Sequence, residues 1–162
     1  MARPCDPFIS TRRNIVFNKI LVPTDGSKLS QKAVQAAMQL AMMNGASLVA
    51  LHVYPTFSGS PYGTFGPAKD VIAEAYAQQH ESEAEKLFAA IKKLAAAAGV
   101  ELDCALVESD DIYRQIIAVA RKKKCELICM ASHGRRGVSA VVLGSETHKV
   151  LTHSAIPVLV IR

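Results

Sequence analysis

Short apolar runs alternate with longer amphipathic segments along this chain of 162 residues. The apolar runs indicate strands, and the segments between them keep the three-to-four-residue apolar spacing of helices. The run from Ser47 to Tyr54 is apolar on both faces, which is typical of a parallel strand covered by helices on each side. The alternation predicts an α/β fold: a single-domain, open, doubly wound, Rossmann-like parallel sheet of five strands with helices on both faces.

The chain length predicts one domain, which we expect to span residues 18–162 after an N-terminal tail of residues 1–17. A helix is predicted to follow Ser27 and to end at Asn44-Gly45, a pair that tolerates the left-handed conformation. The apolar positions of the helix over 70–98, which include Val71, Phe88 and Leu94, predict a buried stripe. The remaining predicted elements are strands at 18–22, 47–54, 100–107, 126–130 and 156–161, and helices at 110–124 and 145–152.

Two polar, glycine-bearing turns are predicted to converge on one crevice. In an open parallel sheet, ligands bind beyond the carboxyl ends of the strands, where the strand order reverses. If the strand order is 3-2-1-4-5, the reversal lies between the first and fourth strands. The segments that follow these strands are 23–27, Pro-Thr-Asp-Gly-Ser, and 130–134, Met-Ala-Ser-His-Gly.

The residue types in these turns suit a nucleotide. Glycine lets backbone approach a ligand, and the free N–H groups and dipole of a helix start favour phosphate. Asp25 is the one carboxylate expected at the crevice, where it either accepts hydrogen bonds from a ribose hydroxyl or caps the first helix. Ser145 and Thr147 are equally plausible as helix caps, and Gly134 and Gly144 as turn residues.

Charge and composition exclude several other classes. The net charge is +5, but no basic stripe with interleaved aromatics is visible, so nucleic-acid binding is not predicted. No apolar stretch reaches the roughly 18 residues of a membrane helix, and the N-terminus lacks the apolar region of a signal peptide, so we expect a cytoplasmic protein without membrane contact. The four cysteines lack metal-ligand spacing and are interpreted as reduced core residues.

His133 does not carry the pattern of a catalytic histidine. No carboxylate is adjacent to it in the sequence, and no serine lies in a nucleophile-elbow context. We interpret it as a turn histidine with a backbone partner, and His52 as a hydrogen-bonded core residue. The loop over 55–67 is expected either to cover a bound base or to be an insertion without a role.

The chain resembles the universal stress protein family over roughly Asn18 to Arg162. The resemblance is carried by Ile-Leu-Val-Pro-Thr-Asp-Gly-Ser at the start, Leu-His-Val at the end of the second strand, Ser-His-Gly-Arg-Arg-Gly, Leu-Gly-Ser, and the closing Ile-Pro-Val-Leu-Val-Ile. ATP-binding members carry Gly, two residues, Gly, nine residues, then Gly with Ser or Thr. Gly134 and Gly144-Ser145 fit this pattern, whereas Ala131 replaces the first glycine. Alanine adds a methyl group and disfavours positive φ, but it keeps the N–H donor.

The resemblance implies a cofactor-binding set and no catalytic or metal-binding residue. Asp25 would contact the ribose or adenine side with Pro23 and Thr24 beside it, Val53 would offer its backbone to adenine, and Met130 would line the base or sugar pocket. Gly134, Gly144, Ser145 and Thr147 would hold the phosphates. Arg135 and Arg136 would either add charge nearby or lie on the surface. The complete predicted set is Pro23, Thr24, Asp25, Val53, Met130, Ala131, His133, Gly134, Arg135, Gly144, Ser145, Glu146 and Thr147.

The function implied by the resemblance is ATP binding, with Mg²⁺ or Mn²⁺, in stress response or signalling, with at most slow hydrolysis. A homodimer through the C-terminal strand and unidentified protein partners are also expected. The alternative is an ATP-independent dimeric interaction module of the same fold, which Ala131 motivates. An adenylating enzyme would be expected to carry paired glycines after the first strand, and this chain has Pro-Thr-Asp-Gly-Ser instead. A flavin electron carrier is a further possibility on this fold.

Overall fold

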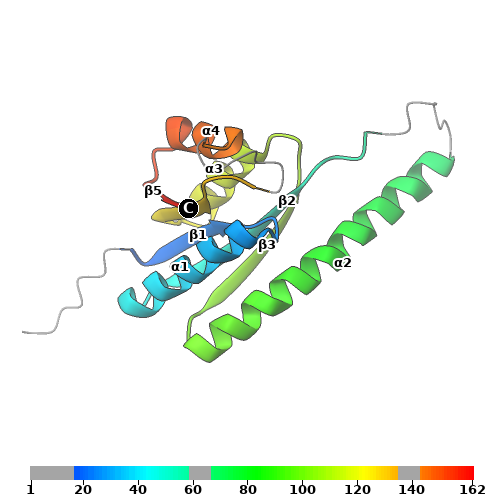
Figure 1. The fold of residues 1–162 in the computed structure, drawn as a ribbon. Helices are drawn as coiled ribbons and strands as arrows, with labels where there is room; N and C mark the ends of the chain where they lie inside the picture. The colour runs from blue at the N-terminus through cyan, green and yellow to red at the C-terminus, as the bar shows by residue number, and fades with distance from the viewer. Residues whose placement is uncertain (1–16, 59–66, 135–142) are drawn as a thin grey trace, which may run out of the picture.

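A five-stranded parallel sheet in the order β3-β2-β1-β4-β5 organises the molecule (Figure 1). The computed structural model describes residues 17–58, 67–134 and 143–162. This sheet confirms the predicted fold class and strand order. The elements are β1 (Lys19–Pro23), α1 (Lys28–Asn44), β2 (Ser47–Tyr54), α2 (Pro67–Ala98), β3 (Leu102–Glu108), α3 (Ile112–Lys122), β4 (Leu127–Ala131), α4 (Ser145–His153) and β5 (Val158–Ile161).

Helices cover both faces of the sheet, as two-sided apolar strands require. Helices α1 and α2 lie on one face, and α3 and α4 lie on the other (Figure 1). The central strand β1 supplies side chains to both cores: Ile20 and Val22 pack toward α1, and Leu21 packs toward α3. All three side chains are fully buried. The sheet is therefore the wall shared by two apolar cores.

Helix α2 reaches beyond the sheet at its N-terminal end (Figure 1). Phe88 and Ile91 are buried as predicted, but Val71 is 66% exposed and Leu94 is 48% exposed. The prediction of a continuous buried stripe was wrong at these two positions. Val71 lies near the N-terminal end of α2, well before Ala84, the first of its buried residues, and Leu94 precedes Ala95, which occupies the buried position in that turn.

Three helices end in the same backbone motif, in which a residue in the left-handed conformation follows the last turn. Gly45 after α1 has φ 67°, and Gly99 after α2 has φ 65°. After α3 the position is held by Lys124, with φ 57°. Around Lys124, the N–H of Cys125 donates to the Ala120 carbonyl at 2.8 Å, and the N–H of Lys124 itself donates to Arg121 at 3.0 Å. These bonds satisfy carbonyls that the helix end would leave unpaired.

The same backbone motifs explain where the predicted boundaries were wrong. The helix predicted over 110–124 ends at Lys122, because Lys124 takes the left-handed conformation. The strand predicted from Val100 begins at Leu102, because the N–H of Val100 donates to Ala95 at the end of α2. The strand predicted from residue 156 begins at Val158, directly after Pro157.

Cys104, Cys125 and Cys129 are free thiols. Burial raises the pKa of the Cys125 and Cys129 thiols to about 11, which keeps both protonated near neutral pH.

Within the described ranges, no helix is both long and apolar enough to cross a membrane.

Replacing Lys124 with glycine should stabilise the protein. A non-glycine residue in the left-handed region costs about 1–2 kcal/mol, and glycine removes that cost while adding some flexibility to the unfolded chain. We expect Lys124→Gly to raise the free energy of unfolding by about 0.5–1 kcal/mol, measured by urea denaturation at neutral pH.

The reverse replacement at the end of α2 is the matched control. Gly99 has φ 65°, and a Cβ built there meets no atom within 4 Å, so Gly99→Lys tests backbone strain without a steric clash. We expect it to lower the free energy of unfolding by a similar amount. Equal stability of Lys124→Gly and the unaltered protein would refute the strain at position 124.

Candidate functional site

A cleft opens where β1 and β4 separate. The pairing of β1 with β2 continues to Pro23↔Leu51, whereas its pairing with β4 ends at Leu21↔Ile128. The cleft is open to solvent, and its empty volume with that open mouth included is about 650 Å³. It is lined by Pro23, Thr24, Asp25, Ser30, Leu51, Val53, Ile112, Ile116, Met130, Ala131, His133, Gly134, Glu146 and Thr147.

Most of the residues predicted for the site therefore line one cleft. Gly144 and Ser145 lie at the start of α4 but do not line it. Arg135 and Arg136, and residues 59–66 of the predicted loop, lie outside the described residues. The three apolar residues that sequence reasoning missed, Leu51, Ile112 and Ile116, resembled ordinary core positions. Ser30 was missed because its hydroxyl is one turn inside α1.

The loop after β1 is held in place by β2. The N–H of Thr24 donates to the Leu51 carbonyl at 2.8 Å, and Nδ1 of His52 lies 2.8 Å from the Thr24 carbonyl. Because a carbonyl only accepts, Nδ1 of His52 carries the proton in this bond. The hydrogen bond predicted for His52 is confirmed, but the residue is only partly buried and not a core residue. The Thr24 hydroxyl is buried and lies 3.1 Å from the Ser30 hydroxyl, which fixes the loop to α1 as well.

Asp25 sits where the two polar loops meet. Its Oδ1 accepts a hydrogen bond from the N–H of Ser27 at 3.0 Å, and Ser27, not Asp25, is the N-cap of α1. A Cβ on Gly134 would lie 2.7 Å from Asp25 Oδ2, closer than real contacts allow. Gly134 therefore permits the loop after β4 to pass directly against the Asp25 carboxylate.

The end of β4 and the start of α4 are tied together. Ala131 lies in the strand and pairs with Ile161, and its carbonyl accepts a hydrogen bond from the buried Thr147 hydroxyl at 2.9 Å. Ala131 is absent from the positive-φ residues of the described chain, so only its methyl group distinguishes it from glycine there.

Gly144 is required by close approach and not by its backbone angles. It is the N-cap of α4 with φ −60°, a value open to any residue. Its N–H donates to the Ser132 carbonyl at 2.8 Å, and a Cβ would lie 3.1 Å from both that oxygen and Cα of His133. This packing places the first turn of α4 against the loop after β4.

His133 contacts a side chain and not the backbone partner that was predicted for it. Nδ1 of His133 lies 3.2 Å from the Ser132 hydroxyl, a side-chain partner. The ring lines the cleft together with Asp25 and Glu146, whose carboxylates are the two acidic groups of the described lining. The described lining residues include no lysine or arginine.

This chain resembles members of one protein family in both sequence and structure. The sequence model of the Universal stress protein family matches residues 17–162. Universal stress protein YxiE of Bacillus subtilis is 33% identical over 150 residues, covering 91% of this chain and 100% of that protein. Universal stress protein MJ0531 of Methanocaldococcus jannaschii is 29% identical over 147 residues, covering 91% and 83%. Universal stress protein UspA from Lactobacillus plantarum superposes with a TM-score of 0.76 at 24% identity, covering 90% and 97%.

Two further structures of this fold were solved with nucleotides. A universal stress protein in complex with cAMP has a TM-score of 0.58 at 23% identity, covering 90% of this chain and 97% of its own. A universal stress protein from Archaeoglobus fulgidus in complex with dAMP has a TM-score of 0.59 at 17% identity, covering 89% and 97%. The family match over nearly the whole chain and the identity to YxiE settle the assignment: this chain belongs to the universal stress protein family.

Proposed function

We propose that the cleft binds an adenine nucleotide, ATP with Mg²⁺ or Mn²⁺, and that the protein acts in stress response or signalling with little or no turnover. One observation carries the proposal: Asp25 and Gly134 meet at the point where β1 and β4 separate, beside the start of α4. A carboxylate and close backbone at a strand-order reversal are the features with which open α/β sheets bind nucleotides.

The apolar side of the cleft suits a base and a sugar. Leu51, Ile112 and Ile116 supply flat aliphatic walls, and Val53 and Met130 line the same space. Asp25 would accept hydrogen bonds from ribose hydroxyls, with Pro23 and Thr24 beside it. The bonds from β2 to Thr24 hold this loop in one position, so little ordering would accompany binding.

The start of α4 would receive the phosphates. Its first N–H groups have no intrahelical acceptors and point out of the helix end, where the dipole favours negative charge. Gly134, Gly144 and Ser145 lie on this side. The Thr147 hydroxyl already donates to Ala131, so Thr147 would contribute its backbone N–H.

A divalent cation would arrive with the phosphates. The described residues hold no cluster of three or more histidine, cysteine or acidic side chains that could bind a metal alone. The donors near the phosphate side, the Glu146 carboxylate and the Ser145 hydroxyl, are oxygen ligands of the kind that Mg²⁺ takes. The cation would supply charge neutralisation for the triphosphate. The cAMP and dAMP complexes of two relatives support the adenine-nucleotide class.

Titration calorimetry with ATP and MgCl₂ tests the proposal. We expect saturable binding, and we expect Gly134→Ala to weaken it about tenfold, because the new methyl group must displace Asp25 Oδ2 from 2.7 Å. Gly99→Ala, which changes a glycine far from the cleft, should leave affinity unchanged. An absence of heat at millimolar ATP would exclude the proposal.

An ATP-independent interaction module of the same fold is the second candidate, because Ala131 stands where ATP-binding members carry glycine. Since Ala131 lies in regular strand, Ala131→Gly would remove one methyl group and cost about 0.5–1 kcal/mol of stability. Under the ATP-binding proposal, the unaltered protein binds ATP and this variant binds with similar affinity. ATP affinity that appears only in Ala131→Gly would favour the interaction module.

We also propose a homodimer through β5. This strand forms one edge of the sheet, and Leu159 on it is 36% exposed, so an unpaired apolar edge is available to a second copy. Sedimentation velocity at micromolar concentration should give a dimer, and Leu159→Lys should shift it toward monomer. A purely monomeric unaltered protein would contradict this assembly.

A further inference from the structure

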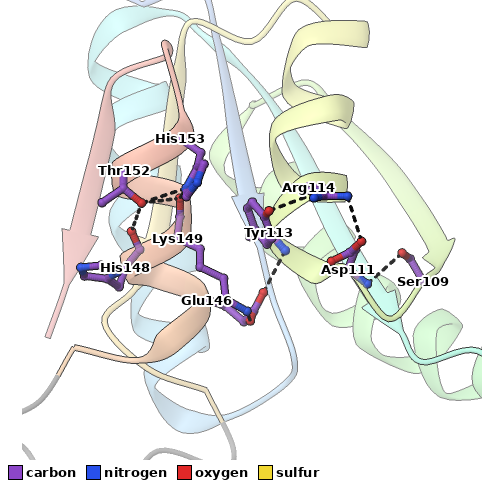
Figure 2. Close-up of polar contacts among 9 residues, drawn as sticks. All are labelled: Ser109, Asp111, Tyr113, Arg114, Glu146, His148, Lys149, Thr152 and His153. Atoms are coloured by element: carbon purple, nitrogen blue, oxygen red, sulfur yellow. Dashed lines mark hydrogen bonds and ion pairs between the residues drawn. The ribbon is translucent and has the colours of Figure 1, made fainter.

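Glu146, in the first turn of α4, is held by both oxygens of its carboxylate (Figure 2). Its Oε2 accepts a hydrogen bond from the N–H of Tyr113 at 2.9 Å, and its Oε1 lies 2.8 Å from Nζ of Lys149. The side chain is 31% exposed and lines the cleft. The negative charge is therefore fixed at the cleft wall and cannot move away without loss of both contacts.

The contact with Tyr113 has a structural cause. Asp111 is the N-cap of α3, but its side chain makes no capping hydrogen bond and instead lies 3.4 Å from Nη1 of Arg114. Glu146 supplies the missing acceptor from another helix, since Tyr113 is in the first turn of α3. The dipole at this helix start is also favourable for the negative charge of Glu146.

Glu146 lines the cleft, whereas its partner cation does not. Lys149 does not line the cleft, and its ammonium group lies 5.3 Å from the centre of the Tyr113 ring. Its ion pair with Glu146 raises the pKa of Lys149. Of the two charges in this ion pair, only the negative one therefore contributes to the cleft lining.

This arrangement matters because α4 starts at the side of the cleft that would receive phosphates. Like charges repel strongly over a few ångströms at the edge of a protein, and the repulsion grows with the charge of the ligand. We propose that Glu146 is a specificity-determining residue, which lowers the affinity of the cleft for nucleotides in proportion to their uncompensated negative charge. The inference rests on the proposed function, whose ligand class it narrows to nucleosides, monophosphates and metal-complexed polyphosphates.

A charge series of ligands tests the role of Glu146. Calorimetry with adenosine, AMP and ATP in EDTA would compare the unaltered protein with Glu146→Gln, which keeps an acceptor oxygen for Tyr113. We expect adenosine affinity to be unchanged, AMP affinity to rise about threefold and metal-free ATP affinity to rise about tenfold. A residue with only a structural role would change all three affinities together.

Two controls separate the local charge from other effects. Glu85→Gln, on the exposed face of α2, makes the same change in net charge away from the cleft and should leave the ATP-to-adenosine affinity ratio unchanged. Lys149→Met leaves Glu146 without its counter-charge and should lower that ratio about threefold. This second variant keeps the test decisive if Glu146→Gln does not fold.

The results of these titrations distinguish failure of the role of Glu146 from failure of the proposed function. An unchanged ratio in Glu146→Gln and Lys149→Met, or an equal gain in Glu85→Gln, would overturn the role of Glu146 while the proposed function stands. Failure of all three ligands, and of ATP with MgCl₂, to bind the unaltered protein would refute the proposed function and this inference with it.

Discussion

The separation of β1 from β4 is the constraint on which the rest of the site depends. Both strands are buried on two faces, so their crossovers must carry helices to opposite sides of the sheet. The chain winds one way from β1 to β3 and the other way from β4 to β5, so the helices that follow β1 and β4 lie on opposite faces of the sheet. The cleft is a consequence of this topology, and the side chains at the two strand ends only decide what it accepts.

The side chains around the cleft combine rigidity with tight packing. Thr24 is fixed by β2 on one side and by Ser30 of α1 on the other, while Gly134 and Gly144 allow close contacts that a methyl group would crowd. The loops can therefore approach each other closely because these two positions carry no side chain. The Asp25 carboxylate lies where the two loops meet. A methyl group at position 134 would crowd the Asp25 carboxylate, and one at position 144 would crowd the backbone of Ser132 and His133.

The fold could be predicted because local patterns agreed with the global arrangement. The two-sided apolar run of β2 and the alternation of strands and helices predicted the doubly wound parallel sheet, and the strand order assumed for that sheet is the observed one. The loops after β1 and β4 were identified because glycine, hydroxyl and acidic residues are conspicuous at strand ends. Leu51, Ile112 and Ile116 could not be recognised as cleft residues, because a cleft wall and a core position look alike in sequence. The left-handed Lys124 also lacked a signal, since lysine rarely takes that conformation.

Stability is unevenly distributed along helix α2. Its buried side chains begin at Ala84, and the turns before that residue are held mainly by Tyr76 and His80, which pack near Tyr54 and Pro55 at the end of β2. A helix end with so little buried surface opens at a smaller free-energy cost than the whole domain. We therefore expect the N-terminal turns of α2 to fray at temperatures below the one at which the sheet unfolds. Amide hydrogen exchange would therefore be fastest at the N-terminal end of α2 and would slow progressively toward its C-terminal end.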